Sequence, residues 1–73
     1  MAGKHRNGTA VRWRWGSSHA TGKVSEVFTR RVTRTLKGAK VTKNGSEDCP
    51  AYLIEQEDGT EVLKLHSEVQ RAG

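Results

Sequence analysis

The sequence has a single cysteine, Cys49, among its 73 residues, and this excludes an internal disulfide. Its start, residues 1–7, lacks the apolar segment of a secretory signal peptide. No apolar run approaches the ~20 residues that a membrane-spanning helix needs. We therefore expect a protein of the reducing cytoplasm that has no membrane partner.

Motifs that carry catalysis or bind metals are also missing from the sequence. His5, His19 and His66 have no metal-ligand spacing with one another or with Cys49. There is no glycine-rich phosphate loop, and no pairing of a nucleophile with a base is indicated. We expect a protein with no enzymatic activity, no metal and no cofactor, in which Cys49 is neither a nucleophile nor a ligand.

Hydrophobic residues make up 33% of the sequence, and the aromatic residues are few. A chain this short buries only about 60% of the surface of its unfolded form, so we expect one domain with a small core. We expect Trp13 and Phe28 to be structural. Trp15 and Tyr52, which lie near the ends of predicted strands, are the candidates for exposed aromatic residues.

Apolar and polar residues alternate over residues 9–15, which predicts a half-buried strand. A second strand is predicted over residues 20–28. Val24 and Val27 lie three residues apart, which requires a bulge near Ser25 and Glu26. Gly22 suits a position where another backbone passes closely.

Residues 50–65 form the strongest predicted hairpin, because Asp58-Gly59 separates two β-prone runs. We expect a two-residue loop that places Ile54 opposite Leu63 and Tyr52 opposite Leu65. The alternative, a three-residue loop with a bulge at Gly59, places Glu55 opposite Glu61, which is an unfavourable pairing of like charges.

A second hairpin is predicted over residues 31–43, with Lys37-Gly38 as its loop. Leu36 then pairs with Ala39, Arg34 with Val41, and Thr33 with Thr42. Beyond Leu65, Ser67 is a plausible N-cap for a helical turn that extends to Gln70. The predicted fold is an all-β domain of about five short strands over residues 7–69 with this terminal turn. Residues 1–6 and 70–73 are expected to be flexible tails.

The charges are unevenly distributed along the sequence, whose net charge is +5. Residues 1–43 contain eleven basic residues and one acid, whereas residues 44–73 contain two basic residues and seven acids. Such asymmetry indicates either an anionic partner or basic strands that lie beside acidic strands within one small fold. The candidate ligand-binding residues are Arg12, Arg14, Arg30, Arg31, Arg34, Lys37, Lys40 and Lys43.

Several short motifs resemble a known family. They are Gly8-Thr9-Ala10-Val11-Arg12-Trp13 with Gly16, Gly22-Lys23-Val24 with Glu26-Val27, Pro50-Ala51-Tyr52-Leu53-Ile54 through Asp58-Gly59, and Val62-Leu63-Lys64 with His66-Ser67-Glu68. With them the chain resembles the hypervirulence-associated protein Tudor-domain family, formerly a domain of unknown function. The resemblance implies a Tudor-like, SH3-like five-stranded β-barrel, and it implies neither an enzymatic activity nor agreed site residues.

Three functions remain open at this point. The first is a binding module that recognises nucleic acid or a nucleotide through the basic hairpin. The second is a protein-interaction module that reads a peptide or a methylated side chain through Trp15 and Tyr52, or pairs with another strand at an exposed hairpin edge. The third is an oligomeric barrel that binds NADPH, which rests on analogy between folds. The oligomeric state does not follow from the sequence.

Overall fold

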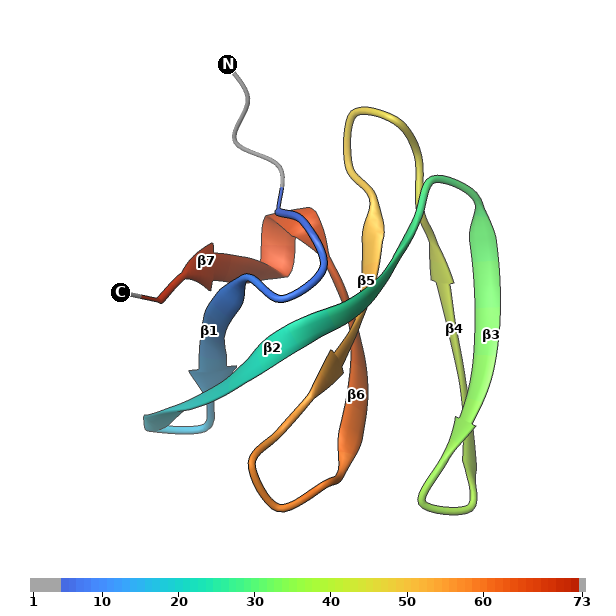
Figure 1. The fold of residues 1–73 in the computed structure, drawn as a ribbon. Coiled ribbons are helices and arrows are strands. Elements are labelled where there is room, and N and C mark those ends of the chain that lie inside the picture. Colours follow the sequence, from blue (N-terminus) through green and yellow to red (C-terminus); the bar gives the residue numbers. More distant parts are fainter. Residues whose placement is uncertain (1–4, 73) are drawn as a thin grey trace.

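The computed structural model describes residues 5–72, which form strands and one short 3-10 helix (Figure 1). In chain order these are β1 (Ala10–Trp15), β2 (Ser18–Phe28), β3 (Arg31–Leu36), β4 (Ala39–Asn44), β5 (Ala51–Glu55), β6 (Glu61–Leu65), η1 (His66–Glu68) and β7 (Val69–Arg71). The prediction of a β-rich fold is confirmed, but the described residues form seven strands rather than five. No helix in this part of the chain is long and apolar enough to cross a membrane.

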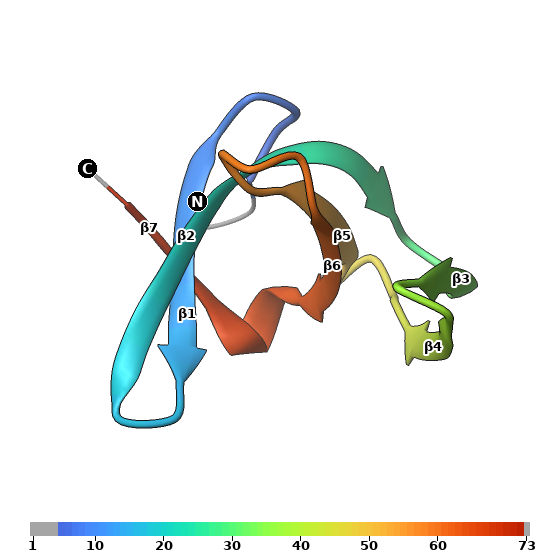
Figure 2. The same cartoon turned by 90° about the horizontal axis from the view of Figure 1, so that it is seen from below.

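The strands form two sheets, and within residues 5–72 no hydrogen-bonded ladder closes them into the predicted barrel. One sheet has five strands in the order β6-β5-β2-β1-β7, and the other is the hairpin β3–β4. The five-stranded sheet is strongly curved, and β3–β4 lies beyond its β5–β6 end (Figure 2). β4 packs beside β6 without pairing with it, so side chains rather than backbone hydrogen bonds join the two sheets.

The curvature of the main sheet depends on β2, as the sequence predicted. The pairing of β2 with β5 shifts between Val24 and Glu26, which confirms a bulge at Ser25. The Ser25 hydroxyl donates to the carbonyl oxygen of Leu53 at 3.1 Å. A Cβ atom at Gly22 would lie 2.6 Å from Cγ2 of Ile54 and 2.7 Å from the carbonyl oxygen of Glu55, so this close passage of two strands is also confirmed.

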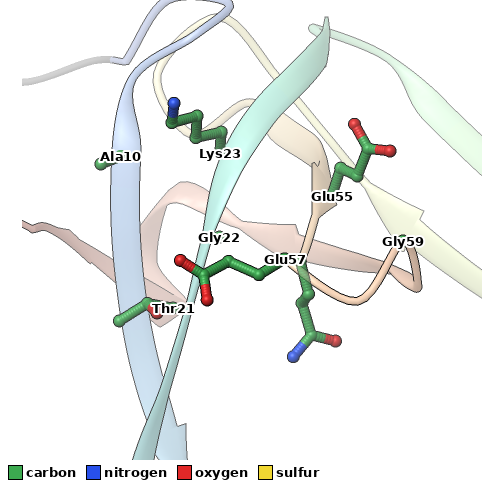
Figure 3. A pocket seen from close by; sticks show the side chains of 8 residues that line it. Ala10, Thr21, Gly22, Lys23, Glu55, Glu57 and Gly59 are labelled. Atoms are coloured by element: carbon green, nitrogen blue, oxygen red, sulfur yellow. The ribbon is translucent and has the colours of Figure 1, made fainter.

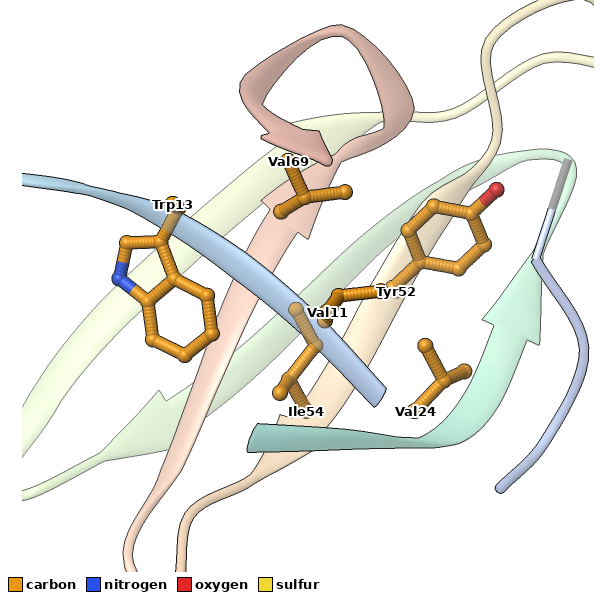
Figure 4. Packing of buried hydrophobic residues seen from close by; sticks show 6 residues of the cluster. All are labelled: Val11, Trp13, Val24, Tyr52, Ile54 and Val69. Carbon is orange, nitrogen blue, oxygen red and sulfur yellow. The ribbon is translucent and has the colours of Figure 1, made fainter. Parts of the chain in front are cut away.

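The buried side chains form two clusters, and the second of them joins the two sheets through Val32. The first, here called the barrel core, is Val11, Trp13, Val24, Tyr52, Ile54 and Val69 (Figure 4). The second, here called the hairpin core, is Phe28, Val32, Ala51, Leu53 and Leu63. Successive residues of β5 point into the two clusters alternately, so this strand is buried on both faces. The structural roles predicted for Trp13 and Phe28 are confirmed.

The predicted register of the β5–β6 hairpin is wrong by one residue. Glu55 lies opposite Glu61 and Leu53 opposite Leu63, with the three-residue loop that was the alternative. Gly59 has φ +88°, whereas Asp58 does not have the positive φ that a type I′ turn requires. Asp58 Oδ1 instead accepts a hydrogen bond from the backbone N–H of Thr60 at 3.0 Å, which favours the longer loop.

The β3–β4 hairpin has the register that the sequence predicted. Leu36 pairs with Ala39, and Thr33 pairs with Thr42. Lys37 and Gly38 both have positive φ, at 53° and 78°, as a type I′ turn requires. The hydroxyl oxygens of Thr33 and Thr42 lie 2.9 Å apart on the exposed face of the hairpin.

Both ends of the described chain are more ordered than the sequence predicted. The 3-10 turn is capped at Leu65 rather than at Ser67, and the backbone N–H of Leu65 donates to Glu68 Oε1 at 2.7 Å. Residues 70 and 71, expected in a tail, belong to β7, which pairs with β1. Residues 5 and 6, also expected in a tail, are described, whereas residues 1–4 and 73 lie outside the described part.

Candidate ligand-binding surface

The structure divides the predicted basic residues into two groups. Arg12 and Arg14 belong to β1, whereas the other six lie on residues 30–43. This segment, here called the basic hairpin, comprises the residue before β3, β3 itself and all but the last residue of β4. Both views place β1 and β3–β4 at opposite ends of the molecule (Figures 1 and 2). The eight residues therefore do not form one surface, and only the basic hairpin concentrates positive charge.

Internal ion pairs account for only part of the charge on the basic hairpin. Arg34 Nη2 lies 3.7 Å from Glu26 Oε1, and Lys43 Nζ lies 3.1 Å from Glu68 Oε1. The remaining basic residues of the hairpin are exposed and have no ion-pair partner among residues 5–72. These are Arg30, Arg31, Lys37 and Lys40.

One face of the basic hairpin packs against the hairpin core, and the other face is exposed. The inner face carries Val32 into the hairpin core, and Arg34 places its guanidinium carbon 5.0 Å from the ring centroid of Phe28. Strand alternation places Arg31 and Lys40 on the other face, together with the threonine hydroxyls. Cations and hydroxyls side by side on an exposed sheet face suit the oxygen atoms of phosphate groups.

Of the two aromatic residues predicted to lie at the surface, one is exposed and the other is buried. Trp15 is 69% exposed, which confirms its predicted position at the surface. Tyr52 is fully buried in the barrel core, so its predicted exposure is wrong. Its position near a strand end suggested exposure, but β5 is paired with β2 on one side and β6 on the other, so even its second residue lies at the centre of the fold. The two side chains therefore do not form a shared aromatic cage.

Tyr52 is surrounded by two histidines that the sequence did not connect with it. Its hydroxyl lies 2.9 Å from His66 Nδ1 and accepts a hydrogen bond from the backbone N–H of His5 at 3.1 Å. The ring centroids of His5 and His66 lie 5.2 Å apart. Burial lowers the pKa of His5, and the nearby charges of His66 and Arg71 lower it further. Nothing in the sequence pattern indicated this cluster, because it joins chain segments that are far apart.

This cluster predicts that acid destabilises the fold through His5. Because the folded-state pKa of His5 lies below its ordinary value of 6.5, the unfolded chain binds a proton more readily than the folded chain does. This contribution to the free energy of unfolding is complete above pH 6.5 and is lost as the pH falls through the folded-state pKa. Urea denaturation between about pH 7.5 and 5.5 should show decreasing stability.

The matched variants for this prediction are His5→Gln and Arg6→Gln. His5→Gln should reduce the pH dependence of the free energy of unfolding over this range. Arg6→Gln alters the same segment but removes a group that stays charged throughout. It should therefore keep the parental dependence. Equal pH dependence in the parent and in His5→Gln would contradict the assignment.

A hollow of about 440 Å³ lies between β2 and the β5–β6 loop. Figure 3 shows Lys23, Glu55 and Glu57 among the side chains that surround it. With two carboxylates and one ammonium group, the hollow does not suit an anionic ligand. Among residues 5–72, no three histidine, cysteine, aspartate or glutamate side chains are grouped so that they could hold a metal ion.

A smaller cavity of about 280 Å³ opens beside Trp15. The residues that line it include the apolar Trp13 and Val62 and the charged Asp58 and Lys37. Hydrogen bonds from the hydroxyl and backbone N–H of Thr60 lower the pKa of Asp58, so this carboxylate remains charged at neutral pH. The cavity thus combines an aromatic surface with charged groups of both signs.

Comparison with known proteins agrees with this β-rich architecture. No curated protein and no solved structure shows significant similarity to the chain. The family model described as the TUDOR domain of hypervirulence-associated proteins matches residues 8–69, which include every strand as far as the start of β7. The chain therefore belongs to the family of hypervirulence-associated protein TUDOR domains.

Proposed function

We propose that the chain is a small, non-enzymatic binding module whose basic hairpin holds the phosphate backbone of a nucleic acid. The observation that carries this proposal is the set of four exposed cations on residues 30–43 that form no ion pair among residues 5–72. A segment of fourteen residues with six basic residues and no acid produces a strong local positive potential.

Internal complementarity of charge is the competing explanation for this hairpin, and it covers too little of the charge. Only Arg34 and Lys43 form ion pairs with carboxylates among the described residues, although Lys37 lies near the carboxylate of Asp58. Glu55 and Glu61 lie opposite each other on the β5–β6 hairpin, and neither forms an ion pair with a basic residue among the described residues. An external anion is therefore the better partner for the remaining cations.

A peptide reader that uses Trp15 together with Tyr52 is less well supported, because Tyr52 is buried. A free nucleotide cofactor is also less well supported than a nucleic acid. The unpaired cations are spread along both strands of an open sheet and do not converge on one pocket. Charges distributed in this way suit a polymer of phosphates.

The proposal predicts salt-dependent binding of oligonucleotides, measured by the fluorescence anisotropy of a labelled strand. Each phosphate contact should contribute about 0.7 to the slope of log affinity against log salt on single strands and about 0.9 on duplexes. With four free cations we expect a slope between about −2 and −4 over roughly 25 to 200 mM salt. Sequence preference should be slight, since contacts to phosphates do not read bases.

The decisive variant is the triple change Arg31→Gln, Lys37→Gln and Lys40→Gln. It should flatten the slope and weaken binding while leaving the melting temperature unchanged, because the three side chains are exposed. The matched control changes Arg6, Lys23 and Arg71 to glutamine, which removes equal charge from exposed positions outside the hairpin. Absence of binding at the lowest salt, or equal weakening by both triple variants, would contradict the proposal.

A further inference from the structure

We infer that the cavity beside Trp15 receives one unpaired base of the same nucleic acid, so that the preferred ligand is single-stranded. This inference rests on the proposed function and concerns the base, whereas the proposed function concerns the phosphates. Three turns lie at the same end of the molecule: the β1–β2 turn, the β3–β4 turn and the β5–β6 loop (Figure 1). The cavity is lined by residues from or next to all three.

Trp15 provides the aromatic surface for stacking. It lies on the same face of β1 as Trp13, whose side chain is only 4% exposed within the barrel core. Because β1 extends beyond that core, the indole of Trp15 emerges at the mouth of the cavity with 69% of its surface exposed. Bases of single strands stack on exposed aromatic side chains of this kind, whatever their sequence.

The β5–β6 loop provides polar groups for the edge of a base. The Thr60 hydroxyl lies 2.6 Å from Asp58 Oδ1 and 2.9 Å from Gln56 Oε1, and it can donate its one proton to either oxygen. Oδ2 of Asp58 remains able to accept a hydrogen bond, and the amide group of Gln56 remains able to donate one. Unpaired bases present donors and acceptors to side chains of this kind.

The lysines at the cavity favour a nucleotide over a cationic guest. Lys37 and Lys64 both line it, so a methylated or free ammonium group would face two positive charges and one carboxylate. Lys37 also belongs to the basic hairpin, so the phosphate path proposed above leads directly to the cavity. A volume of about 280 Å³ lies just below the ~300–1,000 Å³ of pockets for drug-sized ligands, and it suits a single base.

The test compares a labelled oligothymidine with an abasic oligonucleotide of the same length, which has the same phosphates and no bases. Trp15→Ala should weaken binding of oligothymidine by roughly 5- to 150-fold, the range found for stacking of a base on an aromatic side chain. It should leave the salt slope and the affinity for the abasic strand unchanged. Oligothymidine should also quench tryptophan fluorescence in the parent protein, and the abasic strand should not.

Two variants control for fluorescence and for lost hydrophobic surface. Trp15→Phe retains a stacking ring and keeps the buried Trp13, so it should bind oligothymidine with little loss and without the quenching. Val27→Ala removes part of another exposed hydrophobic side chain, away from the cavity, and should bind as the parent does.

The outcomes separate the inference from the proposed function. Equal affinity of the parent for oligothymidine and the abasic strand, each with the expected salt slope, overturns the inference and leaves the proposed function standing. The same holds if Trp15→Ala binds oligothymidine as tightly as the parent, or if a duplex binds as tightly as the single strand. Failure of every oligonucleotide to bind overturns both.

Discussion

Ile54→Asp should abolish cooperative folding of the domain. Ile54 is fully buried in the barrel core, between Gly22 on one neighbouring strand and Val62 on the other. The substitution removes about 1.5–3 kcal/mol of hydrophobic burial and adds a carboxylate that has no partner there. A small domain has a free energy of unfolding near the low end of the usual ~5–15 kcal/mol. The combined loss should therefore exceed this free energy, and the variant should be unfolded.

Thermal and urea denaturation followed by circular dichroism will measure this effect. Ile54→Val keeps an apolar side chain and should cost only ~0.5–1.5 kcal/mol. Thr21→Asp introduces the same carboxylate at an exposed position of β2 opposite Arg12, and it should melt close to the parent. A cooperative transition of Ile54→Asp at the parental temperature would mean that Ile54 is not in the core.

The position of the β5–β6 turn was predicted from the sequence, but the register of its two strands was not. Asp58-Gly59 identified the β5–β6 hairpin, but like-charge repulsion between Glu55 and Glu61 was given too much weight. Both glutamates are exposed, and repulsion between exposed charges is weak in water. Hydrophobicity could not settle the register either, because β5 is apolar on both faces and fills two clusters.

The β3–β4 hairpin was easier to predict because only one of its faces is apolar. Val32 and Leu36 must point toward the core together, which leaves one acceptable register for Val41. Lys37-Gly38 then closes the shortest favourable loop. β7, in contrast, has three residues, which are too few for an alternating pattern to predict a strand.

The candidate site was predicted only where it consists of neighbours in the sequence. The charge of the basic hairpin is local, so composition alone revealed it. Which cations are neutralised depends on Glu26 and Glu68, and these come from β2 and η1. The cavity beside Trp15 joins three turns from distant parts of the chain, and no sequence pattern places them at one end of the molecule.

Gly45→Ala should destabilise the domain most strongly among single-methyl additions to its turns. A Cβ atom at Gly45 would lie 2.5 Å from the carbonyl oxygen of Phe28 and 2.9 Å from that of Arg30, both of which are backbone atoms that cannot rotate away. The N–H of Gly45 also donates to the carbonyl oxygen of Arg30 at 3.1 Å, which continues the pairing of β3 and β4 by one step at the base of the basic hairpin. We expect a loss at or above the upper end of the ~1–3 kcal/mol seen for overpacked cores.

For a domain of this size that loss corresponds to a fall in melting temperature of roughly 10–20 °C. Gly59→Ala is the comparison: a Cβ there has open space, so the cost is limited to the ~1–2 kcal/mol of the left-handed conformation at φ +88°. Gly45→Ala should therefore melt below Gly59→Ala. It should also weaken oligonucleotide binding at temperatures where it is still folded, because the hairpin must move relative to Trp15. A variant Gly45→Ala that melts at the parental temperature would show that the close packing of Gly45 against the backbone does not hold the basic hairpin in place.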